Sequence, residues 1–114
     1  MNNPMFLEYN LINDTIKPTY MVKITFTDNY HKESFWVWVE SVENDVITGI
    51  ISNKLLTNKL ELGQIITFDK SCVKETSNRS YSKEETITSI KLIEIGNNPI
   101  TKYFESLNVK ISQT

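Results

Sequence analysis

The residues best suited to chemistry are few in this chain. It contains a single cysteine, Cys72, and a single histidine, His31, which lie far apart in the sequence. A nucleophilic site needs a base beside the nucleophile, and a zinc site needs several thiolate, imidazole or carboxylate ligands at converging positions. The sequence shows neither pattern, so we expect no catalytic residues, no metal site and no cofactor. Cys72 is interpreted as a half-buried structural thiol and His31 as a surface turn residue.

Two other kinds of site find little support in the sequence. A phosphate cradle needs neighbouring glycines, and the glycines of this chain lie far apart, at Gly49, Gly63 and Gly96. A carboxylate pair for acid–base catalysis needs two acids to meet across strands, which a few glutamates could do: Glu8, Glu33, Glu40, Glu94 and Glu105. Single glutamates on strands are usually solvated. We therefore interpret the chain as non-enzymatic and keep an enzyme as the alternative.

The stretch ESFWVWVE, residues 33–40, gives the clearest binding signal. Successive side chains of a strand point to opposite faces, so Trp36 and Trp38 share one face while phenylalanine and valine occupy the other. Either the strand is sandwiched between two apolar layers, or the tryptophans form a contact platform on the surface. Glu33 and Glu40 flank the pair where a nucleic-acid platform would carry lysine or arginine. This favours the core or a protein contact over a phosphate backbone.

A second candidate is the polar run KETSNRSYSKEE, Lys74–Glu85. We predict a solvated hairpin loop here, with a partner-contacting loop as the alternative. Tyr81 is its only large apolar residue, and Arg79 is the sole arginine of the chain. The predicted binding residues of the whole chain are Trp36, Trp38, Glu40, Arg79 and Tyr81.

Alternating apolar residues and turn signals predict the elements that must position these side chains. We expect a short helix within Asn3–Lys17, and a tight connection at Glu43–Asp45. A cap at Asn98 followed by Pro99 predicts a C-terminal helix from Pro99 to about Leu107. The predicted strands are Tyr20–Thr27, Ser34–Val42, Val46–Ser52, Gln64–Val73 and Thr86–Ile95. The expected fold class is α+β: a bent antiparallel sheet of about five strands, or a partly open small barrel, with the C-terminal helix packed on it.

Composition sets the broad class. The 114 residues suit a single domain spanning 1–114, and 39% hydrophobic residues suffice for one core. A net charge of −2 without a basic stripe makes duplex nucleic acid a poor partner. No signal peptide or membrane-spanning run is evident, and a lone cysteine suits a reducing compartment, so we expect a cytoplasmic protein. Abundant Asn, Ile, Lys and Thr indicate an A/T-rich bacterial or phage genome.

The runs YMVKITF, FWVWVESVENDVITG, NKLL and LELGQIITF resemble the bacterial "domain of unknown function 2314" family over about half of the chain. The matching positions are Val22, Lys23, Phe26, Phe35, Trp36, Val37, Val39, Asp45, Thr48, Gly49, Asn53, Leu60, Gly63, Thr67 and Phe68. The resemblance implies a small β-rich core and carries over no catalytic residue. The chain departs from the family at Trp38, where the family has an acid, and after its fourth predicted strand. Related domains look like companions of bacterial immunity and toxin-neutralising proteins, so the resemblance implies a role of that kind.

These observations favour a non-enzymatic protein-binding module, in the form of an immunity or counter-defence protein that blocks a partner. The alternatives are a small barrel that binds single-stranded nucleic acid, and a small-ligand-binding domain with a pocket between sheet and helix. An exposed apolar strand would also provide an edge for a homodimer.

Overall fold

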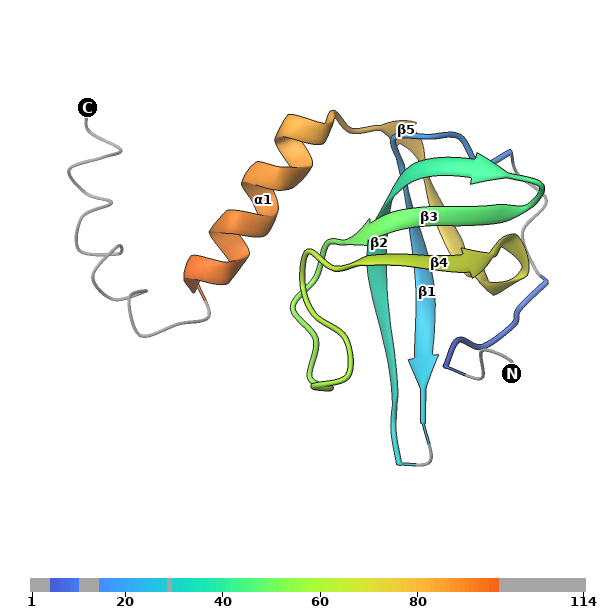
Figure 1. Cartoon of the computed structure of the whole chain (residues 1–114), viewed down its shortest axis with the longest axis horizontal. Coiled ribbons are helices and arrows are strands. Elements are labelled where there is room, and N and C mark those ends of the chain that lie inside the picture. The colour runs from blue at the N-terminus through green and yellow to red at the C-terminus, as the bar shows by residue number, and fades with distance from the viewer. Residues whose placement is uncertain (1–4, 11–14, 29, 97–114) are drawn as a thin grey trace.

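The computed structural model describes residues 5–10, 15–28 and 30–96. In chain order its elements are β1 (Tyr20–Thr27), β2 (Lys32–Glu43), β3 (Val46–Ile51), β4 (Ile65–Asp69), the 3₁₀ turn η1 (Lys70–Cys72), β5 (Glu75–Ser80) and α1 (Lys83–Gly96). Figure 1 shows one sheet with α1 beside it. The expected fold class is confirmed: the described chain is α+β, with an antiparallel sheet that is not closed and a helix that follows the last strand in the sequence.

The sheet is a meander whose last strand returns to the first. Its strand order is β4-β3-β2-β1-β5, and every neighbouring pair is antiparallel. In a flat sheet the edge strands β4 and β5 would lie roughly 19 Å apart. The link between them, 70–74, contains the 3₁₀ turn and is therefore too compact for that span. The sheet must bend, and Figure 1 shows β3 and β4 running across the direction of β1.

The bend is concentrated in the long strand β2, which contributes to both halves of the sheet. Its pairing with β3 shifts register between Val39 and Ser41, as a β-bulge does. The β2–β3 turn places Asn44 and Asp45 at positive φ, 51° and 68°, the conformation that two-residue hairpin turns require. The tight connection predicted at Glu43–Asp45 is therefore confirmed.

A large apolar core fills one face of the sheet. Its fully buried side chains include Val22, Ile24, Phe26, Phe35, Val37, Val39, Ile47, Ile51 and Val73. The N-terminal segment also crosses this core, because Phe6 pairs with Phe26 through an isolated β-bridge and its ring lies 6.1 Å from that of Phe68. The core thus uses the residues at alternate positions of β1 and β2, as the period of two predicted.

Two predicted elements are wrong. The stretch Thr86–Ile95, predicted as a strand, lies inside α1, because β-branched residues there imitate the alternation of a strand. The fifth strand is instead β5, within the run Lys74–Glu85 that was predicted as a loop. β5 is polar because it is an edge strand with only partly buried or exposed side chains, so it carries no apolar alternation.

The predicted terminal helices have different outcomes. Within Asn3–Lys17, the described residues 5–10 and 15–17 are not helical. They include a backbone pairing with β1, in which Leu7 N–H donates to Thr25 O and Thr27 N–H donates to Met5 O. The helix predicted at Pro99–Leu107 lies outside the described residues. Among the helices of the described ranges, none has the length and apolarity needed to cross a membrane.

Candidate functional site

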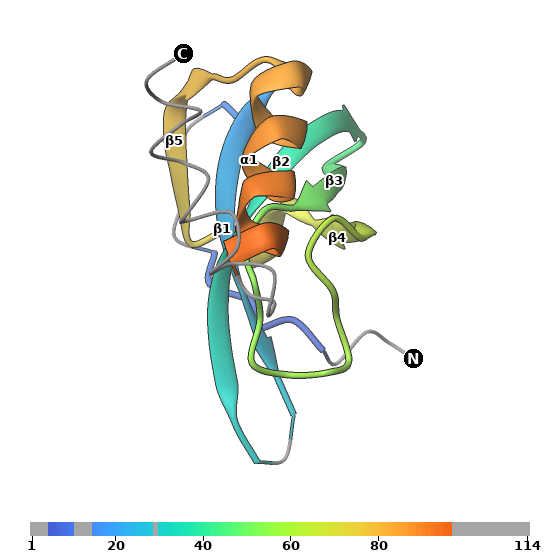
Figure 2. The same ribbon diagram turned by 90° about the vertical axis from the view of Figure 1, so that its left-hand side faces the viewer.

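Helix α1 covers the face of the sheet opposite the main core. Figure 2 shows it in front of β1 and β2. A small apolar cluster lies beneath it, made of the buried residues Trp38, Ile50 and Ile90 with Met21, Leu62 and Tyr81 packed around them. The strand β2 is therefore sandwiched at Trp38, with the main core on one side and this second cluster on the other.

Trp38 is an architectural residue. Only 4% of its surface is exposed, and its indole Nε1–H donates a hydrogen bond to the carbonyl of Tyr81 at 2.8 Å. A buried indole needs such a partner, since its N–H would otherwise lose its hydrogen bond to water. Because Tyr81 lies two residues before Lys83, the first residue of α1, this bond ties the start of the helix to β2. Burial of Trp38 excludes the surface platform of two tryptophans.

Trp36 has a different environment on the same face. It is half-buried, and its backbone N–H donates to Oδ1 of Asn53 at 2.6 Å. The ammonium of Lys23, its direct neighbour on β1, lies 5.7 Å from the centre of its ring. Of the two tryptophans, Trp38 is thus covered by the helix, whereas Trp36 borders an open cavity.

This cavity has a volume of about 330 Å³ and lies between α1 and the sheet. Its lining combines four large apolar side chains with three hydroxyls and an amide: Met21, Trp36, Tyr81 and Ile93, with Ser52, Ser77, Ser89 and Asn53. Small-ligand and side-chain pockets commonly have this composition, with apolar walls and a few polar groups that orient the occupant. The cavity can therefore accept an apolar or aromatic group.

The other predicted binding residues lie around the start of α1. The guanidinium carbon of Arg79 lies 4.0 Å from the ring centre of Tyr81, which itself lines the cavity. Glu40 is exposed and forms an ion pair with Lys83 at 3.5 Å. The structure thus brings Trp36, Tyr81 and Arg79 to one side of the molecule. It places Trp38 beneath them and Glu40 beside the first turn of the helix.

The helix that forms one wall of the cavity begins with a capping box, a feature not predicted from the sequence. The Glu85 N–H donates to Ser82 Oγ at 3.0 Å, and the Ser82 N–H donates to Glu85 Oε1 at 2.9 Å. The pattern Ser-x-x-Glu at 82–85 is the sequence signal that would have predicted this helix start. With the helix recognised, Ser89 and Ile93 could have been placed on the face turned toward the sheet.

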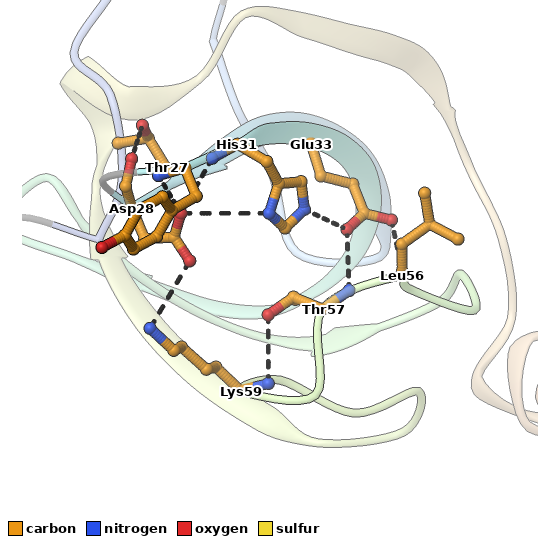
Figure 3. A network of polar contacts seen from close by, with 8 residues as sticks. Thr27, Asp28, His31, Glu33, Leu56, Thr57 and Lys59 are labelled. Atoms are coloured by element: carbon orange, nitrogen blue, oxygen red, sulfur yellow. Dashed lines mark hydrogen bonds and ion pairs between the residues drawn. The ribbon is translucent and has the colours of Figure 1, made fainter.

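A polar cluster away from the cavity lies where the β1–β2 turn meets the β3–β4 loop (Figure 3). Asp28 Oδ1 accepts the backbone N–H groups of Tyr30 and His31 at 2.8 and 2.9 Å. These two bonds, together with Lys59, hold the pKa of Asp28 below its ordinary value despite some burial. The Asp28 carboxylate therefore shapes the hairpin turn.

Glu33 performs the corresponding task for the loop. Its carboxylate accepts the N–H of Leu56 at 2.7 Å and the N–H of Thr57 at 3.2 Å. Burial raises the pKa of Glu33, but the hydrogen bonds from Leu56, His31 and Thr57 outweigh it and leave the pKa below its ordinary value. His31 lies between the acids, with Nε2 3.3 Å from Glu33 and Nδ1 3.9 Å from Asp28.

The main-chain partners of both carboxylates identify this polar network as a structural link between turn and loop. His31 is half-exposed beside the hairpin turn, as expected of a turn residue. Within the described part of the chain, no three His, Cys, Asp or Glu residues are grouped as a metal site requires. Cys72 is buried more fully than expected, and burial raises the pKa of its thiol, which disfavours the nucleophilic thiolate.

The glutamates considered for acid–base catalysis lie in separate places. Glu8 accepts from the hydroxyl of Ser71 at 3.4 Å, while Glu33 holds the loop and Glu40 pairs with Lys83. Glu94 borders a larger hollow of about 490 Å³ beneath the loop residues 54–62. Glu105 lies outside the described residues. The cavity beside Trp36 is therefore the place where the predicted site residues and a hollow surface coincide.

Neither a family model, nor a curated protein, nor a solved structure matches the chain.

Proposed function

We propose that this chain is a non-enzymatic protein-binding module that blocks a partner protein, in the manner of a bacterial or phage immunity or counter-defence protein. The observation that carries the proposal is the apolar cavity bordered by Trp36 and Tyr81, with Arg79 stacked on Tyr81. Tryptophan, tyrosine and arginine are the side chains that most often dominate the energy of protein interfaces, especially around a pocket. The resemblance to the "domain of unknown function 2314" family favours the blocking role.

The cavity indicates what the partner would present. Its apolar walls suit one aromatic or aliphatic side chain, and the Asn53 amide and the Ser89 hydroxyl supply hydrogen-bonding groups around that side chain. Arg79 is exposed and fixed over a ring, so its guanidinium can donate to a carbonyl or carboxylate at the rim with little loss of rotamer freedom. The lone cysteine favours a reducing compartment, so we propose a cytoplasmic partner.

Local charge supports a protein partner over a nucleic acid. Two lysines beside the candidate site are paired with acids, Lys23 with Glu75 at 3.9 Å and Lys83 with Glu40 at 3.5 Å. Binding of single strands depends on basic groups that track the phosphates alongside stacking aromatics. Paired lysines serve that purpose poorly.

The test is affinity capture with three forms of the purified chain. Wild type, Ser89→Arg and Thr88→Arg are immobilised and exposed to lysates of several bacterial hosts. Ser89 lines the cavity, whereas Thr88 is its exposed neighbour on α1 and does not, so the two variants introduce the same side chain inside and outside the site. We expect one protein to be retained by wild type and Thr88→Arg and lost by Ser89→Arg. Capture that is equal on all three forms, or absent on all, would count against the proposal.

The volume of the cavity also favours a second candidate, a small-ligand-binding domain. Pockets for small molecules commonly start at about 300 Å³. A ligand that binds the folded state raises the melting temperature. A thermal-shift screen should then give a stabilising compound for wild type and Thr88→Arg that leaves Ser89→Arg unchanged. Equal stabilisation of all three forms would place the compound elsewhere.

A further inference from the structure

The two edges of the sheet are protected to different degrees. Along β5 the pairing with β1 shifts register between Tyr20 and Val22, and Asn78 sits at positive φ, 59°, inside the strand. Such irregularities prevent another strand from pairing along an edge. β4, the opposite edge, reads IITFD and contains no lysine, proline or register shift in its pairing with β3. Its single charged side chain, Asp69, stands at the end of the strand, so residues 65–68 carry none of the charges, prolines or bulges that oppose strand addition.

The backbone groups available along β4 follow from its ladder with β3. The Lys70 N–H donates to Asp45 O, and the Ile51 N–H donates to Gln64 O. Hydrogen-bonded pairs alternate along an antiparallel ladder, so the pairs Ile47–Phe68 and Gly49–Ile66 between these ends are hydrogen-bonded as well. Ile66 and Phe68 are therefore bonded to β3. Ile65 and Thr67 turn their N–H and C=O groups outward, as Asp69 does its N–H. Among the described residues, none of these outward groups has another partner.

The side chains beside these groups leave the edge accessible. Ile65, Thr67 and Asp69 are all exposed, and Ile65, at 62%, is one of the most exposed large apolar residues of the described chain. A strand added to β4 would thus satisfy free backbone groups and cover apolar surface at the same time.

We propose that β4 is a dimerisation edge, at which a second copy of this chain adds its own β4 antiparallel. Two-fold pairing about Ile66 places Ile65 of each copy opposite Thr67 of the other copy. Both outward groups of each residue are then bonded across the interface. A β-branched pair on an exposed face is a favourable cross-strand neighbour.

The strand also disfavours the neighbouring register. Pairing about Thr67 would set Ile65 opposite Asp69, which brings an apolar side chain against a carboxylate. Pairing about Ile66 sets Asp69 opposite Gly63, so the only charged side chain of the strand meets no side chain. No residue of β4 lines the cavity beside Trp36, so the dimer edge does not depend on the proposed function of that cavity.

Analytical ultracentrifugation of the full chain tests the dimer. The 13.2 kDa chain should shift toward twice this mass as the protein concentration rises, because a single strand pair buries a small interface. Ile65→Lys should abolish the shift, because lysine on an edge opposes pairing. Val46→Lys is the matched control, one strand away from the edge, and should still dimerise. Thr67→Pro should also be monomeric, since it removes only an outward N–H and leaves the ladder with β3 intact.

Two results would overturn the inference. One is a wild-type mass of 13.2 kDa up to millimolar protein. The other is a dimer that Ile65→Lys and Thr67→Pro leave unchanged while both remain folded by circular dichroism. In the first case, Ile65 and Thr67 amide signals that stay unchanged on addition of a peptide of residues 63–70 would show that the edge does not pair with its own sequence.

Discussion

At the scale of single residues, the two tryptophans of β2 perform different tasks. Both point to the face covered by α1, but Trp38 is buried against Ile50 and Ile90 while Trp36 borders the cavity. The difference arises from where α1 begins, because the carbonyl of Tyr81 reaches the indole of Trp38. Trp38 thus stabilises the fold and leaves Trp36 available for binding.

Replacing each tryptophan should separate these tasks. We expect Trp38→Ala to lower the free energy of unfolding by about 3 to 5 kcal/mol, the usual cost of deleting a buried aromatic side chain. Trp36→Ala should cost less, since Trp36 is only half-buried. Urea denaturation followed by circular dichroism measures both. Equal losses for the two variants would contradict the division between them.

The carboxylate of Glu33 should make stability depend on pH. Its pKa is lowered in the folded state, so its contribution is present above the unfolded pKa and is lost as the pH falls through the lower folded value. The urea midpoint of wild type should therefore decline below about pH 4. Glu33→Gln should decline less steeply, whereas Glu43→Gln, a change at an exposed glutamate of β2, should follow wild type. Parallel curves for wild type and Glu33→Gln would show that the loop contacts do not contribute.

At the scale of elements, α1 is the part that creates the candidate site. Over residues 83–95 it buries only Thr86 and Ile90, so packing alone holds it weakly and its capping box matters more than for a deeply buried helix. The Ser82 hydroxyl and the Glu85 carboxylate together satisfy backbone N–H groups at the helix start that would otherwise be unpaired.

Removal of this cap should loosen the helix. Ser82→Ala is expected to cost about 1 kcal/mol of stability. Thr88→Ala, an exposed change in the middle of the same helix, should be neutral or slightly stabilising because alanine favours helices. Because α1 covers Trp38, acrylamide should also quench the fluorescence of Trp38 more strongly in Ser82→Ala than in Thr88→Ala. Identical melting and quenching of the two variants would mean that the cap does not hold α1.

The same elements show how far the sequence could predict the fold. The alternation in Tyr20–Thr27 and around Trp36 correctly predicted β1 and β2, because each strand has a deeply buried face. β5 could not be predicted by alternation, since as a polar edge strand it is held by backbone pairing with β1. In α1 the β-branched residues imitated a strand, and the capping box at Ser82 was the better signal.

The candidate site was predictable only in part. Trp36, Trp38 and Tyr81 could be selected by residue type. The sequence could not show that the helix following Tyr81 would bury one tryptophan and leave the other beside a cavity. Asn53 and Ser89 were missed because polar residues in a loop or on a helix carry no periodic signal.

At the scale of the whole molecule, the bent sheet separates three regions. One face holds the main core, the other carries α1 with the cavity beside Trp36, and β4 forms an open edge. The proposed partner binding at the cavity and the proposed self-association at β4 use different residues. Ile65→Lys should therefore give a monomer that still captures the partner, which affinity capture with this variant would check. Loss of capture in this variant would mean that the two surfaces are coupled.

The most direct test of the central claim is the response of the two indole N–H signals to the captured partner. In a ¹⁵N-labelled chain these signals are assigned to Trp36 and Trp38 by comparison with Trp36→Phe. On addition of the partner, we expect the Trp36 signal to shift or broaden while the Trp38 signal, bonded to Tyr81 beneath α1, stays in place. A partner that binds tightly and leaves the Trp36 signal unchanged would contradict the assignment of the cavity as the binding site.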